Sequence, residues 1–126
     1  MGKPNIILIS IEGLNFEKMN CGQPMESGGG FARLCAESLR FTHFFAPSSL
    51  SQPTIASLFT GLTPAEHRLL DNGSTSLSEA TFTLAEKALG VGYNTGFFSG
   101  GAPVLCKSGL QQGFEVCDDE FLSAES

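Results

Sequence analysis

The sequence predicts an α/β fold in which a mostly parallel sheet is flanked by helices. Short β-branched or aromatic runs alternate along the chain with segments whose apolar residues recur at helical spacing. The first run carries apolar side chains on both faces, as does a strand of a parallel sheet that helices cover on both sides. Glycines and prolines separate the runs. Strands that alternate with helices in this way are typical of α/β proteins.

The expected elements follow one another with short loops between them. The predicted strands are residues 5–13, 41–45, 93–101 and 113–119, and the predicted helices are residues 31–40, 53–61 and 76–89. Residues 68–76 are polar and are expected to form a loop.

Each expected helix has recognisable ends or a recognisable buried face. Pro53 suits the first turn of the second helix and Gly61 its exit. Ser76 and Glu79 have the spacing of a capping box at the start of the third helix. The apolar residues expected to face the core are Phe31, Leu34, Cys35 and Leu39 in the first helix, Ile55, Leu58, Phe59 and Leu62 in the second, and Leu77, Leu84, Ala85 and Ala88 in the third.

Composition excludes some classes of function. The chain has 126 residues and a net charge of −6, and its seven Lys and Arg residues are scattered, which argues against a nucleic-acid partner. No apolar run approaches the roughly 20 residues that span a bilayer, so no membrane segment is expected. The N-terminus does not resemble a signal peptide, and a cytoplasmic location is therefore expected. The sequence leaves the oligomeric state open.

The cysteines do not form a recognisable metal motif. Cys21, Cys35, Cys106 and Cys117 show no CxxC spacing, and their even number permits two disulfides. Because Cys35 lies on the apolar face of an expected helix, we predict four reduced thiols.

A carboxylate follows the first predicted strand directly. In open α/β sheets, ligands bind beyond the carboxyl ends of the strands. Glu12 comes after the apolar run 6–11, where a charge is costly unless a partner such as a metal ion neutralises it. Glu12 is thus a candidate metal ligand, and the alternative is a solvated side chain in a loop.

A second candidate precedes the helix at Pro53. Proline at the first helical position would make Gln52 the N-cap and place Ser51 just outside the helix, where free N–H groups and the helix dipole favour an anion. A serine hydroxyl becomes a nucleophile only when a metal or a base activates it. The alternative is that Ser51 is an ordinary cap.

The two histidines differ in their surroundings. His43 lies between phenylalanines in a predicted strand and is expected to be packed structure. His67 follows the helix that Ser51 opens, and it could either line the same rim or serve packing alone.

The order of these motifs resembles the N-terminal part of the sulfatase family, within the alkaline-phosphatase-like superfamily. The resemblance covers residues 4–120 and runs through PNIILISIEGL, FARLCAESLRFTHFFAPSSLSQPTIASLFTGLTPAEH, TLAEKALGVGYNTGFFSGG and GLQQGFEVCDD. Its most specific part is Pro53 to Gly61 together with Pro64 and His67. The resemblance implies that residues 1–126 are the N-terminal segment of a catalytic domain in a longer chain, and that they would form an incomplete alkaline-phosphatase-like fold.

The resemblance also implies an activity and a site. Family members are metal-dependent hydrolases or transferases of sulfate or phosphate esters, so a small-molecule, glycan or lipid ester is the implied substrate. The nucleophile position is Ser51, the first metal ligand is Glu12, and His67 would act at the same site. Ser51 would also contact the metal, a divalent Ca, Mg, Mn or Zn ion, whose remaining ligands would lie downstream of this chain.

Three positions depart from the family pattern. Gly13 stands where a second acidic residue is usual, Ile55 where the signal for oxidation to formylglycine needs an arginine, and Ala65 where a histidine is frequent. We therefore expect Ser51 to remain a serine, which favours phosphate-type esters, and the chain to be inactive by itself. The alternatives are a catalytically dead sulfatase-like protein or anion-binding module and, further away, an unrelated α/β anion-binding domain.

Overall fold

A computed structural model describes residues 2–14, 21 and 25–120 of the chain. The chain divides into two units, Met1–Phe44 and Phe45–Ser126, and each is described by itself. None of the described helices is long and apolar enough to cross a membrane.

The described residues of the first unit form an extended segment and one helix. The run at residues 5–11, predicted to be a buried strand, pairs with no strand in the described part of the chain, and its side chains are exposed, Ile7 to 83%. Residues 41–45 are likewise unpaired and exposed, so both strand predictions are wrong for this structure. A strand needs neighbouring strands that form hydrogen bonds with it. The apolar pattern of a segment indicates that it could pair, but does not show that a partner strand is present.

The helix of the first unit, α1, spans Met25–Glu37 and kinks at Gly29, whose φ is 65°. It begins and ends earlier than predicted. Of its apolar residues, Ala32 is buried, whereas Leu34 is exposed, as is Leu39 beyond the helix end. The predicted apolar face of this helix is therefore not buried in a core of the first unit.

The four cysteines are paired, which corrects the prediction of reduced thiols. Disulfides join Cys21 to Cys35 and Cys106 to Cys117. The paired cysteines are 14 and 11 residues apart, and neither spacing matches a motif that predicts a disulfide. Pairing therefore depends on whether the fold brings the two sulfur atoms close together. Disulfides are typical of proteins that fold in oxidising compartments. The cytoplasmic location stays a prediction.

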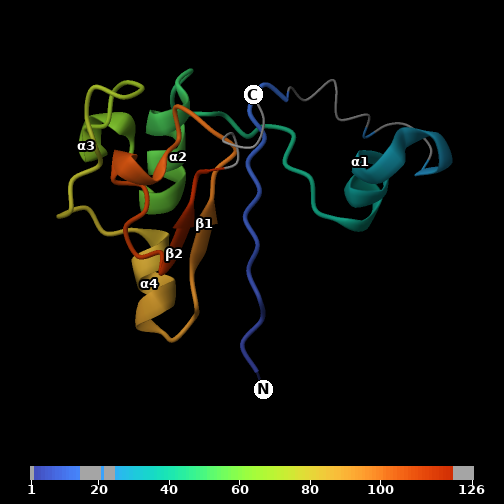
Figure 1. Ribbon diagram of the computed structural model, residues 1–126. Coiled ribbons are helices and arrows are strands. Elements are labelled where there is room, and N and C mark those ends of the chain that lie inside the picture. The colour runs from blue at the N-terminus through green and yellow to red at the C-terminus, as the bar shows by residue number, and fades with distance from the viewer. Residues whose placement is uncertain (1, 15–20, 22–24, 121–126) are drawn as a thin grey trace. The chain divides into compact units, whose positions relative to one another are not determined.

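The second unit contains the sheet. Strands β1, Gly96–Phe98, and β2, Val116–Asp118, pair in parallel with Gly96 opposite Val116 (Figure 1). Thr95 sets this register, because its hydroxyl donates to the Gly113 carbonyl at 2.7 Å and its carbonyl accepts from the Val116 N–H at 3.2 Å. The predicted strands within 93–101 and 113–119 are present and pair in parallel, but each is only three residues long.

In the described part of this unit, three α-helices and a 3₁₀ helix accompany these strands. They are α2, Ser51–Thr60; α3, Pro64–His67; α4, Leu84–Gly90; and η2, Cys106–Ser108. Helix α2 ends at Gly61, as predicted, and Gly61 has the left-handed conformation.

Helix α4 starts later than predicted. Its N-cap is Thr83, with Glu86 completing the capping box, instead of Ser76 with Glu79. The Thr83 hydroxyl is buried and also donates to the Gln112 carbonyl at 2.9 Å, so a tertiary contact selects this cap over the other candidate.

The core of the second unit lies between α2, the sheet and the loops. Its buried members are Ile55, Ala56, Phe59, Leu69, Leu77 and Leu110. Phe59 packs edge-on against Phe97 of β1 at 5.9 Å between ring centroids and against Phe114 at 5.5 Å. Leu58 and Leu62, predicted to share the buried stripe of α2, are exposed.

Gly113 permits the start of α4 to approach the loop before β2. Its φ is +82°, and a Cβ at this position would lie 2.2 Å from the Glu86 nitrogen. Both the backbone conformation and the contact exclude a side chain.

We predict that Gly113→Ala lowers the free energy of unfolding by about 2–4 kcal/mol, because the methyl group would push α4 away from the sheet. Urea unfolding followed by circular dichroism measures this. Gly100→Ala is the matched control, since a Cβ there meets nothing within 4 Å. Equal effects of the two substitutions would contradict the packing described for Gly113.

Candidate active site

Ser51 is the first residue of α2. The N-cap is Leu50, and the first helical hydrogen bond runs from the Thr54 N–H to the Leu50 carbonyl at 3.2 Å. The prediction that Gln52 caps the helix is therefore wrong by two residues. The Ser51 side chain is half-buried, and within the described residues its hydroxyl makes no hydrogen bond. A hydroxyl in this state is free to meet a ligand.

The start of α2 offers fewer N–H groups than the sequence suggests. The Gln52 N–H donates to Asn72 Oδ1 at 3.0 Å, and Pro53 has no N–H to offer. The Ser51 N–H is left without an acceptor among the described residues. The hydroxyl and the N–H of one residue, together with the helix dipole, are thus what this end of α2 presents to an anion.

The Gln52 side chain is buried, with only 3% of its surface exposed, and it connects α2 to two loops. Its Oε1 accepts from the Gly73 N–H at 2.8 Å, and its Nε2 donates to the Pro103 carbonyl. Because Pro103 follows β1, this contact places the start of α2 beside the carboxyl end of a parallel strand. That is the edge at which α/β sheets bind ligands.

Ile55, which stands where the signal for oxidation to formylglycine needs an arginine, is buried. Ile55 is one turn after Ser51 and belongs to the core cluster with Ala56 and Phe59. A cationic side chain at position 55 would therefore be placed in the core of this unit. Because the residue there is isoleucine, position 55 adds no positive charge near Ser51.

His67 joins α3 to α2 and is only 3% exposed. Its Nδ1 accepts from the Leu69 N–H at 3.1 Å, so the proton of the neutral ring lies on Nε2, which contacts the Ser57 hydroxyl at 3.0 Å. Ser57 and His67 are therefore no nucleophile–base pair, because the nitrogen that faces the hydroxyl already carries a proton. The predicted catalytic role of His67 stays a prediction.

Burial lowers the pKa of His67, because a charged ring would lose its hydration. The carbonyl of Pro53 and the charge of Glu66 act in the opposite direction but are the smaller effects. Glu66 itself has a pKa below its usual value, because the Thr63 N–H and hydroxyl donate to its carboxylate.

The remaining predicted residues lie in the first unit. Glu12 is exposed at the end of the extended segment, and its role as a metal ligand stays a prediction. His43, expected to be packed, is exposed, with Nδ1 3.0 Å from the Thr42 hydroxyl. Ser51 and His67 share the second unit, whereas Glu12 belongs to the first.

The described residues do not make a complete metal site. Among them there is no group of three or more His, Cys, Asp or Glu side chains that could hold a metal ion. One carboxylate and one hydroxyl, Glu12 and Ser51, fall short of the six or more oxygen ligands that a hard cation takes.

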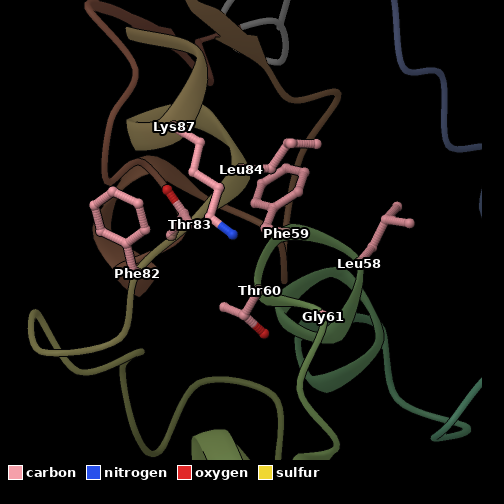
Figure 2. Close-up of a pocket in the computed structure, with 8 residues that line it drawn as sticks. All are labelled: Leu58, Phe59, Thr60, Gly61, Phe82, Thr83, Leu84 and Lys87. Atoms are coloured by element: carbon pink, nitrogen blue, oxygen red, sulfur yellow. The ribbon is translucent and has the colours of Figure 1, made fainter. Parts of the chain in front are cut away.

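A hollow of about 230 Å³ lies at the other end of α2 (Figure 2). It is lined by Leu58, Phe59, Thr60, Gly61, Phe82, Thr83, Leu84 and Lys87. Its two hydroxyls are committed elsewhere, Thr60 to the Ala56 carbonyl and Thr83 to the cap of α4. Lys87 supplies its only charged group, with Nζ 6.0 Å from the Phe82 ring centroid. Ser51 is not among the lining residues, so this hollow is separate from the candidate site.

Sequence reasoning missed Asn72 and assigned Gln52 the role of N-cap instead of its contacts with two loops. The Asn72–Gly73 pair is typical of a turn, and this signal could have placed a loop there. Nothing in the sequence indicates that the loop reaches back to the start of α2.

Known proteins match this chain over most of its length. The family model described as Sulfatase matches residues 4–120. Arylsulfatase A of Homo sapiens is 35% identical over 101 residues, which are 74% of this chain and 20% of that protein. The N-acetylgalactosamine-6-O-sulfatase of Bacteroides thetaiotaomicron is 32% identical over 99 residues, 75% of this chain and 19% of that protein. The chain thus spans about a fifth of the length of these curated relatives. No solved structure matches it significantly.

We predict that stability falls on acidification below about pH 6.5 and that His67 causes part of the fall. Because burial lowers its folded-state pKa, the unfolded chain takes up the proton first; the neutral ring's contribution is complete above pH 6.5 and is lost below it. The contribution of Glu66 is lost separately, below about pH 4.5.

Urea midpoints between pH 5 and pH 7.5 test this. His67→Gln should flatten the decline, and the control His43→Gln, at an exposed position, should keep it. Identical pH slopes for the two variants would contradict the assignment.

We predict that Ile55→Arg destabilises the chain by about 3 kcal/mol or more, because it places a guanidinium in the core. Leu58→Arg, on the same helix but 38% exposed, should cost less than about 1 kcal/mol. Chemical denaturation of both variants gives the comparison. An Ile55→Arg variant as stable as Leu58→Arg would show that the side chain at position 55 can leave the core and reach solvent.

Proposed function

The chain belongs to the sulfatase family, and from this premise we propose that it carries the nucleophile of a metal-dependent hydrolase or transferase of sulfate or phosphate esters. The observation that supports the proposal most is the state of Ser51. Its hydroxyl is uncommitted within the described residues and lies in the first turn of α2, which Gln52 ties to the loop after β1. The family relatives named above are sulfatases.

The proposed reaction is a displacement at phosphorus or sulfur. The Ser51 oxygen forms a bond to the central atom, the bond from that atom to the ester oxygen breaks, and the alcohol leaves with a proton. Water then attacks the seryl ester and regenerates the hydroxyl. In this scheme the Ser51 N–H donates to the charge that develops on a non-bridging oxygen, where a fixed donor is worth more than in water.

Phosphate-type esters are the favoured substrates in this proposal. The position that would support oxidation to formylglycine holds Ile55, which packs in the core. An unmodified serine forms a phosphoseryl intermediate that water can attack, whereas a sulfated serine is harder to release without the hydrate of formylglycine. Small-molecule, glycan and lipid esters remain the candidate classes.

The metal ion would supply charge neutralisation and activation of the nucleophile. Glu12 is the ligand that this chain offers, and the further ligands would come from residues outside it. In the same proposal residues 1–126 form the N-terminal part of an alkaline-phosphatase-like catalytic domain. The exposed apolar run at 5–11 supports it, because such a run requires neighbouring strands to cover it.

A second candidate function is that of an anion-binding protein without catalysis. The loss of catalysis is favoured because Ile55 packs in the core and contributes no positive charge, and the Ser51 hydroxyl and N–H at the start of α2 would bind the anion. The same serine would then bind its ligand without forming a covalent bond.

We predict that Ser51→Ala in the full-length protein lowers kcat for p-nitrophenyl phosphate by at least about 10³-fold, because the nucleophile is lost. Ser49→Ala is the control, since Ser49 is exposed and lies two residues away. The assay with p-nitrophenyl sulfate in parallel distinguishes the two ester classes. Retention of activity by Ser51→Ala would refute the proposal, and an inactive full-length wild type would favour the non-catalytic candidate.

The isolated chain should hydrolyse neither ester, because its metal ligands are too few. Hydrolysis by residues 1–126 alone that is abolished by Ser51→Ala would show that the site is complete without further residues.

A further inference from the structure

Gln52 uses both ends of a buried side-chain amide. Its Oε1 accepts from the Gly73 N–H at 2.8 Å, and its Nε2 donates to the Pro103 carbonyl. Its backbone N–H donates to Asn72 Oδ1 at 3.0 Å. A buried amide is costly to leave unpaired, so these three hydrogen bonds act together to fix one orientation of Gln52.

The partners come from two loops that are remote in sequence. Asn72 and Gly73 belong to the loop between α3 and α4, and Pro103 belongs to the loop that follows β1. The hydrogen bonds thus join three segments at one residue, and that residue is bonded directly to Ser51. The peptide unit between Ser51 and Gln52 cannot rotate without breaking the contact to Asn72.

Ser51 itself lacks such restraints. Within the described residues no hydrogen bond holds its hydroxyl, and its N–H has no acceptor. Its location relative to the loop after β1 is therefore set through its neighbour, by the side chain of Gln52.

We propose that Gln52 is a positioning residue that orients Ser51 toward the ester. This inference rests on the proposed function, in which Ser51 is the nucleophile. Gln52 does not touch the substrate; its amide fixes the first turn of α2 against both loops, so that the Ser51 oxygen approaches along one direction. A displacement of about 1 Å at such an atom can cost about 10²-fold in rate.

A second glutamine provides a matched control. Gln112 also donates through Nε2 to backbone carbonyls, those of Leu77 at 3.1 Å and Ser78 at 3.3 Å. These contacts connect Gln112 to the loop that precedes α4, and none of them involves a residue next to Ser51 in the sequence. Gln112→Met therefore removes a comparable amide without altering the start of α2.

The test compares Gln52→Met with Gln112→Met in the full-length protein, with p-nitrophenyl phosphate and p-nitrophenyl sulfate as probes. Methionine keeps the length of the side chain and removes its hydrogen bonds. We expect Gln52→Met to lower kcat by about 10- to 100-fold with KM within about threefold. Gln112→Met should keep kcat within about threefold. Thermal unfolding of each variant fixes an assay temperature at which both are folded.

The outcomes separate the inference from the proposed function. If Ser51→Ala abolishes turnover but Gln52→Met has the same kcat as Gln112→Met, the positioning role of Gln52 is refuted, whereas the role of Ser51 as nucleophile is supported. A rise in KM alone for Gln52→Met would also refute it, because that result indicates contact with substrate. If Ser51→Ala retains full activity, the proposed function fails and the positioning role fails with it. A variant that does not fold is replaced by Gln52→Glu, which keeps the acceptor for Gly73 and loses the donor to Pro103, with the same expectation for kcat and KM.

Discussion

The packing of Phe59 on the sheet determines the geometry of the second unit. Phe59 lies near the end of α2 and contacts Phe114, which precedes β2, whereas Gln52 near the start of α2 contacts Pro103, which follows β1. Helix α2 therefore runs antiparallel to the two parallel strands. As a consequence its first turn, with Ser51, lies at the carboxyl edge of the sheet. The glycine at 113 and the disulfide at Cys106 hold the loops around this arrangement.

This geometry leaves the Ser51 hydroxyl available to a ligand but does not provide, at position 55, the charge that would bind an anion. The hydroxyl of Ser51 is free within the described residues, and a buried amide fixes the residue beside it. Position 55 contributes no positive charge for binding an anion, because Ile55 packs in the core. His67 is also engaged in packing, with a proton on the nitrogen that faces Ser57. In the proposed function this chain positions the nucleophile, and the charge that activates it would come from a metal ion and from residues outside this chain.

Prediction from sequence succeeded where local signals and tertiary packing agree. The strands at 93–101 and 113–119 and the helix opened near Pro53 were predictable, because glycine, proline and apolar spacing mark them. The run at 5–13 was predicted as a strand, but it pairs with no strand among the described residues, because an apolar pattern alone does not supply a hydrogen-bonded neighbour. The disulfides and the start of α4 at Thr83 depend on contacts between distant segments. The same is true of Gln52, whose three partners lie 20 to 51 residues away.

The central claim is that an unmodified Ser51 forms the covalent bond to the substrate. Acid quenching of the full-length protein during turnover of p-nitrophenyl phosphate, followed by peptide mass spectrometry, measures this directly. The account predicts a phosphoryl group on the peptide that carries Ser51, and an unaltered serine at that position in the resting protein. A peptide that has lost two hydrogens at Ser51, or a phosphoryl group found on another residue, would contradict it.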